Sequence, residues 1–449
     1  MRRTSFASFA FFVAAFAATG ADAQKPADAT IALSLRDAVD LAVAHEGSTR
    51  VALAAELLSQ ALDQSAQSRA ALLPQLDSSV SRIDTVRNLE ALGVRLTSPT
   101  AGFELPRIVG PFNVFDARVT ASQSVFDFSA IRRYQAARIA ASAARQEQLA
   151  SSDVVTAEVA RAYLTAVRAR DQVETAAADV ELAEALAQLA ENRKTAGVGT
   201  GIEVTRAQVQ LANERQNLLL RRQERRAAQL QLLRRIGLEL AVDLRLTTRL
   251  EETAYEPIAV EQALDDALEN RADWQAAGRR LASLQRADSA VRWERLPSVI
   301  AFADYGTIGS SINNSQPTRT YGASVSVPLF DGGRRKARRG ESDSRLRSEE
   351  LRLRDLQAQI ELEVRLASDS LESAAAQMQV AEQGALLAAN ELEQAQRRYK
   401  AGVGSSIEVT DAQTRLARAR QNRLNALYAF NLARVDWGEA RGRVETVIP

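Results

Sequence analysis

AGVGTGIEVT, residues 196–205, returns 205 residues later as AGVGSSIEVT, residues 401–410. Extending the comparison to residues 196–217 and 401–422 gives 15 identities in 22 positions, which chance does not produce. A second matching pair lies upstream, where Phe126-Asp127 corresponds to Phe330-Asp331 at a shift of 204. The sequence therefore predicts two structural repeats of roughly 200 residues each, with the same order of parts.

Closely spaced glycines fit either a phosphate cradle or a tight corner between two helices. A phosphate cradle requires a strand before the glycines, whereas the residues that precede each Gly-Val-Gly are strong helix formers. The glycines can end a helix with positive φ. Thr200 with Glu203, and Ser405 with Glu408, then match the capping box that begins the next helix. The repeated segment thus predicts a corner at the end of a long helical hairpin.

The distribution of proline separates helical segments from the rest of the chain. No proline occurs between Pro111 and Pro257, or between Pro328 and Pro449. These stretches are rich in Ala, Leu, Gln, Glu and Arg, which favour helix, while helix interiors exclude proline. At ~1.5 Å per residue, the longest expected helices reach on the order of 100 Å. The expected helices span about 129–196, 201–236, 334–400 and 405–440.

Between the helices, short segments alternate apolar and polar residues, as in the run from Tyr321 to Leu329. Segments of about ten alternating residues are typical of membrane β-barrels. The phenylalanines agree, because seven of the eight after residue 23 lie between Phe103 and Phe128 or at Phe302 and Phe330. The expected strands span about 75–87, 113–126, 298–308 and 319–329.

Four strands cannot close a barrel, since the smallest outer-membrane barrels have about eight strands. An open sheet edge is not tolerated in lipid. If these strands lie in a membrane, several chains must pool them, and three chains would supply twelve. The alternative is that the two hairpins are soluble and periplasmic.

The first 23 residues read as a secretory signal peptide. Arg2 and Arg3 precede an apolar run, and Ala21-Asp22-Ala23 is a suitable cleavage site. Without this segment, Lys and Arg fall from 57 to 55 and Asp and Glu from 56 to 55, so the charge is balanced. The chain has no cysteine, which excludes disulfides and thiol catalysis. No later apolar run reaches 18 residues, so we expect a periplasmic, secreted or outer-membrane barrel protein.

Together these features resemble the TolC family of outer-membrane efflux proteins over essentially the whole mature chain. The most specific motifs are SVPLFDGGRRKA at 326–337 and RRYKAGVGSSIEVTDAQTRLARARQN at 397–422. The resemblance implies a mainly α fold with a β membrane part. Three chains would form a twelve-stranded β-barrel in the outer membrane, continued by a long α-helical barrel across the periplasm. Its expected parts are repeat 1 at 24–237, an equatorial segment at 238–257, repeat 2 at 258–441 and an equatorial tail at 442–449.

The function implied by the resemblance is that of a passive exit duct for a tripartite efflux pump or a type I secretion system. Such a homotrimer docks tip to tip with a periplasmic adaptor, which links it to an inner-membrane transporter. Selectivity would belong to the inner-membrane pump. The resemblance assigns docking to the tip residues Gly197, Val198, Gly199, Gly402, Val403 and Gly404.

In the family, acidic residues just after the tip turn form rings that narrow the periplasmic entrance. The matching residues here are Glu408 and Asp411, with Glu203 in the first repeat. Three copies of each carboxylate near one axis would favour cations. Structural roles also fit, because Glu203 and Glu408 complete capping boxes and Asp411 suits a first helical turn. Repeat 1 has Arg206 where repeat 2 has Asp411, and no residue matches the basic side chain that locks the family's closed state.

Asp127 and Asp331 stand where a strand gives way to a helix, so helix N-caps are their expected role. Basic residues follow directly and would lie just below the membrane, where they can meet lipid headgroups. A solvated helical face is the other interpretation of this cluster. Its members are Arg132, Arg133, Arg334, Arg335 and Lys336.

Two other classes of protein share some of these features. A soluble periplasmic coiled-coil adaptor also has helical hairpins, but usually one per chain. An enzyme is disfavoured, because the single histidine, His45, has no nucleophile or metal-ligand pattern around it, and no cofactor fingerprint is present. The basic run from Arg221 to Arg226 could suggest nucleic acid, yet a balanced charge favours a solvated helix face. We therefore expect no cofactor, no metal and no nucleic acid partner.

Overall fold

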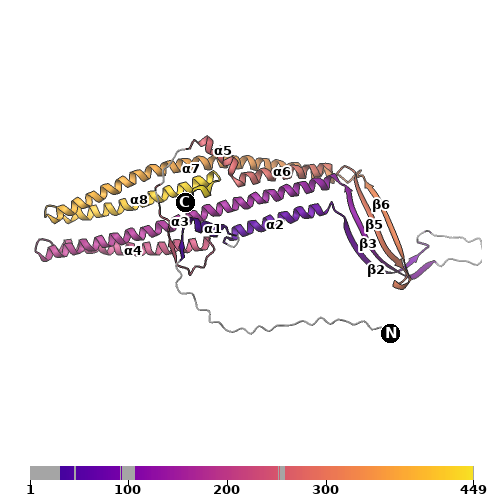
Figure 1. Ribbon diagram of the computed structural model, residues 1–449, viewed down its shortest axis with the longest axis horizontal. Coiled ribbons are helices and arrows are strands. Elements are labelled where there is room, and N and C mark those ends of the chain that lie inside the picture. The colour runs from indigo at the N-terminus through magenta and orange to yellow at the C-terminus, as the bar shows by residue number, and fades with distance from the viewer. Residues whose placement is uncertain are drawn as a thin grey trace, which may run out of the picture.

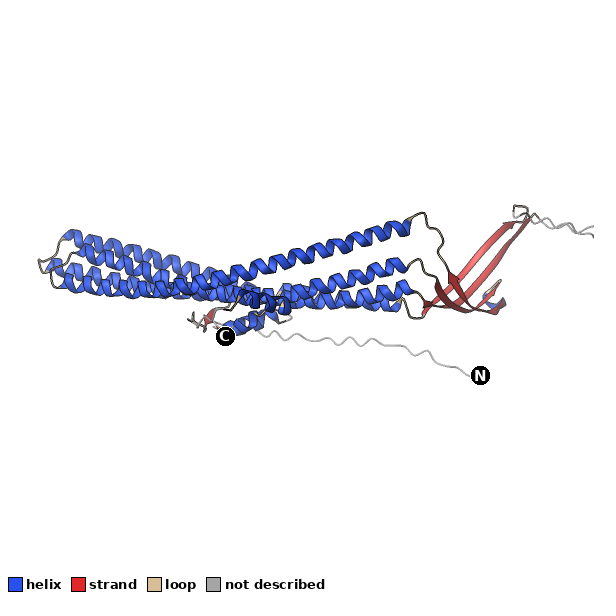
Figure 2. Ribbon diagram, turned by 90° about the horizontal axis from the view of Figure 1, so that it is seen from above, coloured by secondary structure: helices blue, strands red, loops and turns tan. Residues whose placement is uncertain are grey.

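The computed structural model describes residues 31–44, 47–91, 93, 107–250, 252 and 258–447. The molecule is a long rod with strands at one end and two helical hairpin turns at the other (Figure 1). A view turned by 90° shows the helices running as one extended bundle toward the sheet (Figure 2). The expected signal peptide, His45 and Phe103 lie outside the described residues.

Helices make up most of the rod, and the expected long helices are present. α3 (Phe128–Thr195) and α7 (Arg334–Lys400) contain 68 and 67 residues, and each returns through a 35-residue helix. Gly197 and Gly402 separate the two arms of each hairpin. The helices of the described residues are α1 (Leu35–Val43), α2 (Thr49–Ala70), α3, α4 (Gly201–Arg235), α5 (Val260–Asn270), α6 (Ala272–Trp293), α7 and α8 (Ser406–Ala440), with short 3-10 turns at Ile312–Asn314 and Val444–Val447.

Four strands form one antiparallel sheet in the order β2-β3-β5-β6. They are β2 (Gln75–Asn88), β3 (Ile108–Phe126), β5 (Ser298–Gly309) and β6 (Ser315–Ser326). β3 begins earlier than the expected 113, because its first residues pair with the end of β2. β6 does not reach the expected 329, because Ser326 pairs with Ser298, the first residue of β5.

The two faces of the sheet differ in polarity, as alternation along each strand requires. One face carries exposed apolar and aromatic side chains, among them Leu76, Val80, Tyr305, Tyr321 and Val325. The other face carries Asp77, Asp116, Arg118, Thr120 and Asp304, which lie in facing rows of the register. A sheet with this distribution suits lipid on one side and water on the other.

The largest apolar core lies at the waist of the rod, where α1, α3 and the end of α4 meet. The Tyr163 side chain is fully buried there, and its hydroxyl donates to the Leu33 carbonyl at 2.8 Å. Leu33 belongs to β1 (Ile31–Leu33), which pairs in parallel with β4 (Leu244–Leu246). This small two-stranded sheet holds the N-terminal segment against the middle of α3.

Candidate functional site

The two Gly-Val-Gly turns form the end of the rod opposite the sheet (Figure 1). Gly197 and Gly402 have φ of 74° and 77°, a conformation that side chains disfavour and that ends a helix. A Cβ on Gly199 would lie 2.9 Å from the Lys194 nitrogen, so the second glycine is needed for close approach. The sequence interpretation as a helical corner is consistent with this geometry.

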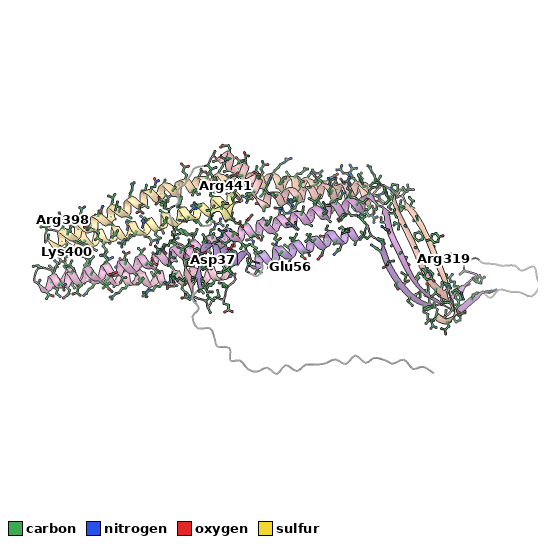
Figure 3. All side chains as sticks on the ribbon, viewed as in Figure 1. Asp37, Glu56, Arg319, Arg398, Lys400 and Arg441 are labelled. Atoms are coloured by element: carbon green, nitrogen blue, oxygen red, sulfur yellow. The ribbon has the colours of Figure 1, made fainter. Side chains whose placement is uncertain are left out.

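An arginine in each repeat holds its turn in the same way. Arg193 donates from Nη2 to the Val198 carbonyl at 3.4 Å, and Arg398 donates from Nη2 to the Val403 carbonyl at 3.4 Å. Val198 and Val403 remain 65% and 69% exposed at the extreme tip. Each turn therefore presents one apolar side chain to the outside on a braced backbone. Arg398 and Lys400 mark this end of the molecule, far from Arg319 on the sheet (Figure 3).

Sequence reasoning missed both arginines, although the duplication contains the signal. Arg193 and Arg398 are related by the same shift of 205 that relates the two turns. Each precedes its first turn glycine by four residues, so its carbonyl can close the turn. Val198 and Val403 donate their N–H groups to these carbonyls at 3.0 and 3.1 Å.

The expected gate acids lie in the first two turns of α4 and α8. The expected capping box is present in repeat 1: the Thr200 N–H donates to Glu203 Oε2 at 3.3 Å, and the Thr200 side chain accepts from the Glu203 N–H. In repeat 2, the Glu408 N–H donates to Ser405 Oγ at 3.3 Å. Arg398 Nε also donates to Glu408 Oε2 at 3.4 Å. Both glutamates thus have a structural role within one chain.

Asp411 differs from the two glutamates because it lies one turn further along its helix than the capping position; its side chain is exposed. The residue in the same position of repeat 1 is Arg206, whose Nη1 donates to Ser406 Oγ at 3.3 Å. The two repeats therefore place opposite charges at equivalent positions. Arg206 contacts the other hairpin, while Asp411 faces solvent.

The two hairpins are joined near the tip through Tyr399. The Arg193 guanidinium lies 4.4 Å above the Tyr399 ring and donates to the Tyr399 carbonyl at 2.9 Å. The Tyr399 side chain is buried, and burial together with the nearby Glu203 carboxylate raises the pKa of its phenol. Below this contact, leucines of α3 pack against α7 and α8 in a small apolar cluster.

The strand-to-helix junctions lie at the opposite end of the helices from the gate acids. Asp127 is the N-cap of α3, and its carboxylate accepts from the Ala130 N–H at 2.9 Å. In repeat 2 the N-cap position is held by Gly333, with φ of 89°, and not by Asp331. The Asp331 carboxylate still accepts from the Arg335 N–H at 3.0 Å, so it acts from outside the helix. The second glycine of the motif shifts the helix start by two residues.

The basic cluster is divided between structural contacts and solvent. Arg132 lies 4.6 Å above the Trp293 ring, and Arg133 lies 3.9 Å from the Asp127 carboxylate. Arg335 Nε donates to Asp331 at 2.9 Å. The remaining two members, Arg334 and Lys336, are exposed.

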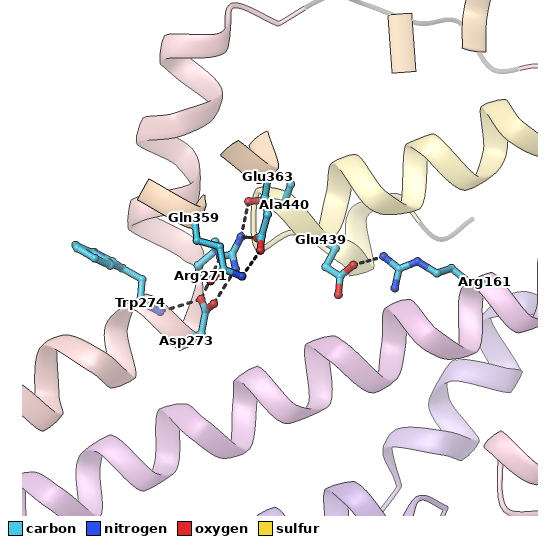
Figure 4. A network of polar contacts seen from close by, with 8 residues as sticks. All are labelled: Arg161, Arg271, Asp273, Trp274, Gln359, Glu363, Glu439 and Ala440. Atoms are coloured by element: carbon cyan, nitrogen blue, oxygen red, sulfur yellow. Dashed lines mark hydrogen bonds and ion pairs between the residues drawn. The ribbon is translucent and has the colours of Figure 1, made fainter. Parts of the chain in front are cut away.

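A half-buried polar network at the waist was not foreseen from the sequence (Figure 4). Arg271 donates to the Asp273 carboxylate at 2.7 Å and to Glu363 at 2.5 Å, which joins α6 to α7. Arg161 of α3 pairs with Asp436 and Glu439 of α8. No short-range motif marks the links between helices, because those partners lie between 92 and 278 positions apart.

Comparison with known proteins agrees with this architecture. A model of the outer membrane efflux protein family matches residues 42–238 and 263–438, one segment per repeat. The chain belongs to this family. It is therefore an outer-membrane export protein whose long helices form a periplasmic extension, and the soluble adaptor alternative does not hold. Members of the family are channels rather than enzymes.

Individual relatives cover most of the chain at low identity. The alkaline protease secretion protein AprF of Pseudomonas aeruginosa is 25% identical and covers 83% of this chain and 76% of its own. The pyoverdine export outer membrane protein OpmQ of Pseudomonas putida is 24% identical and covers 84% and 79%. The structure of the CmeC outer membrane channel of Campylobacter jejuni aligns with a TM-score of 0.79 at 17% identity, covering 91% of this chain and 86% of that one.

No described helix is both long and apolar enough to span a membrane. The described residues contain no group of three or more histidine, aspartate or glutamate side chains that could hold a metal ion.

Proposed function

We propose that three copies of this chain assemble into one passive export duct through the outer membrane and periplasm. The observation that carries the proposal is the sheet, whose outer strands β2 and β6 each have an edge that no described strand covers. Unpaired backbone groups are not tolerated in lipid, so the two edges must pair with other copies. Three four-stranded sheets give a closed barrel of twelve strands.

The helices would continue this barrel across the periplasm. α3 has 68 residues, which corresponds to about 100 Å at 1.5 Å per residue. Exposed leucines and valines on α7 and α4 would pack against neighbouring copies. They include Leu351, Leu362, Leu366, Val380, Leu386, Val209 and Leu219. The described parts of the expected equatorial segments, 238–250 and 442–447, would contribute to the collar around the waist; residues 253–257, 448 and 449 lie outside the described residues.

The helical tips would be both the gate and the docking surface. Three copies of Glu203, Glu408 and Asp411 would gather around one axis and favour cations at the entrance. Val198 and Val403 would supply apolar contacts for the tip of a periplasmic adaptor protein, which connects the duct to an inner-membrane transporter. At the other end, Arg334, Lys336 and their basic neighbours would face lipid headgroups.

The duct would serve an efflux pump or a type I secretion system. One relative is named for alkaline protease secretion and the other for pyoverdine export, so one architecture serves different cargo. We infer that the inner-membrane partner selects the cargo and that this chain provides the passage.

Electrical recording in planar lipid bilayers tests this proposal. Purified protein from the outer-membrane fraction should form discrete ion-conducting pores that prefer cations. Protein that is recovered from the membrane fraction, folded, and yet gives no conductance under any voltage or salt condition would contradict a duct. A variant lacking residues 298–326, which removes half of the sheet, is the control and should give no pores.

A further inference from the structure

The two repeats are related by constant shifts at the membrane end of the molecule. α2 and α6 each contain 22 residues and begin at Thr49 and Ala272, a shift of 223. The two β-hairpins follow the same rule. Gln75 pairs with Ser122 in the first hairpin, and Ser298 pairs with Ser326 in the second. The first strand of each hairpin is thus shifted by 223 and the second by 204.

The chain also shows how one hairpin joins the next. Along the junction of β3 with β5, Ala121 pairs with Ala303 and Phe126 pairs with Val299. The register shifts between Ser124 and Phe126, which marks a bulge near the base of the sheet. This junction is the only one in the described sheet that links repeat 1 to repeat 2.

We infer that β6 pairs with β2 of a second copy in the register that these shifts transfer from the β3–β5 junction. Val325 then lies opposite Val80 of that copy, and Phe330 lies opposite its Leu76. Residues 327–330 join β6 as strand when the neighbour is present. The inference rests on the proposed assembly and specifies how its copies interlock.

Exposure supports this register, because it brings together apolar side chains that the single chain leaves uncovered. Leu329 and Phe330 are each 90% exposed, and Leu76 is 73% exposed. Val325 and Val80 are 64% and 71% exposed. Mutual contact would remove these apolar surfaces from water, or add them to one continuous lipid-facing band.

The register also keeps each face of the sheet uniform. Ser326 falls opposite Ser79, and both belong to the polar face. A slip of one residue would place Val325 opposite a serine of the polar face. Because side chains alternate between the two faces, the same mismatch of apolar and polar side chains would repeat along the whole edge. Pro328 occupies the position of Ser124 at the bulge, where a strand accepts proline.

Side-chain size at the base of the junction is complementary as well. Within the chain, Phe128 packs edge-on against Trp293 at 5.1 Å between ring centroids. The transferred positions are Gly332 and Ala70, which are both small. The space left by two missing aromatic rings suits the side chain of Phe330.

Cysteine pairs test the register directly, because the chain contains no cysteine. Val325→Cys with Val80→Cys, and Phe330→Cys with Leu76→Cys, should give reducible dimers and trimers on mild oxidation, at least tenfold above the controls. The controls pair Val325→Cys with Ser81→Cys on the opposite face, or with Ser78→Cys, a slip of two residues. In the inferred register, the two cysteines of a control pair either point to opposite faces or lie too far apart to form a disulfide.

The mass of the detergent-extracted species is measured on the same samples. A mass of three chains, together with crosslinking only in a control pair or in no pair, would overturn the register. The proposed duct would not be contradicted by that result. A single chain would overturn the assembly itself. As a second probe, a photoreactive benzoylphenylalanine at position 330 keeps an aromatic ring there. It should capture a peptide that contains Leu76, and capture of lipid alone would contradict the inference.

Discussion

At the scale of single residues, the tip combines a fixed backbone with a small number of charges. Glycine ends each helix at positive φ, and an arginine four residues earlier holds the turn. The capping glutamates begin the return helices, so local stability and entrance charge come from the same side chains. Asp411 does not share that double role, because it lies one turn beyond the capping position of α8.

Removing the entrance charge should change ion selectivity and leave the fold intact. In the double variant Glu408→Gln and Asp411→Asn, cation preference should fall and conductance should change, because six carboxylates leave the axis of a trimer. Reversal potentials in a salt gradient measure the preference. The matched control is Asp63→Asn on α2, an exposed acid far from the tip. Unchanged selectivity in the double variant would show that neither acid sets the charge of the entrance.

Removing the link between hairpins should loosen the tip. Arg193→Ala deletes both the contact with the Tyr399 ring and the bond to its carbonyl, together worth about 1–2 kcal/mol. We expect a larger open probability and faster tryptic cleavage near the turn of residues 196–200. Arg398→Ala is the control, because the side-chain hydrogen bonds of Arg398 to described residues stay within its own hairpin. Equal effects of both variants would argue that neither arginine links hairpins.

The sequence predicted the tip turns well because glycine and capping residues act locally. It did not predict Arg193 as a link, because the ring that it contacts lies 206 positions away. Asp331 was expected to be the N-cap of α7 and is not. Gly333, which adopts a left-handed backbone conformation next to the helix, takes that position. The assignments to gating, docking and lipid contact stay predictions.

At the scale of the elements, the waist network should make stability depend on pH. Burial, and then the carboxylates of Glu445, Asp273 and Glu439, raise the pKa of Asp153 to about 6, against the opposing charge of Arg271. The native state therefore holds this proton more tightly than the unfolded chain. The contribution of Asp153 to the free energy of unfolding is fully present below about pH 4 and is lost as the pH rises through about 6.

The variant Asp153→Asn checks this sign. The linkage relation gives about 3 kcal/mol for the shift, and screening by water at this partly exposed site reduces it to about 1 kcal/mol. Denaturant unfolding in detergent should show the wild type less stable at pH 7 than at pH 5. The variant should gain stability at pH 7 and lose part of the pH dependence. A wild type that is more stable at pH 7, with Asp153→Asn destabilising there, would reverse the expected sign.

The sheet depends on a glycine between repeats. A Cβ on Gly306 would lie 2.5 Å from the Ala117 carbonyl oxygen and from Arg118 Cβ, so Gly306→Ala should disturb the β3–β5 junction and lower the yield of assembled protein several-fold. Gly278→Ala on α6 is the control, since its Cβ meets open space and alanine favours helix by about 1 kcal/mol. Equal membrane yields of the two variants, measured by fractionation, would contradict this role.

Helix positions could be predicted closely because proline and glycine mark their ends, as at Gly197 and Gly402. Strand ends could not, because they depend on a partner. β3 is longer than expected where β2 extends to meet it, and β6 stops at Ser326 where β5 begins. The small β1–β4 sheet was missed, since three-residue strands carry no period.

At the scale of the whole molecule, a single chain is structurally incomplete. In the part of the chain that the structure describes, the four-stranded sheet has two unpaired edges, and large apolar side chains such as Leu329 and Phe330 lie uncovered. Membership of the outer membrane efflux protein family accounts for this incompleteness. The chain is one part of a closed tube, and the repeat within it shows how the parts meet.

The most direct test of this account is the mass of the species extracted from the outer membrane in detergent, with the detergent subtracted. The account predicts three times the mass of the mature chain, because three sheets are needed to close the barrel. A species with the mass of one chain, folded and stable in the same detergent, would contradict it.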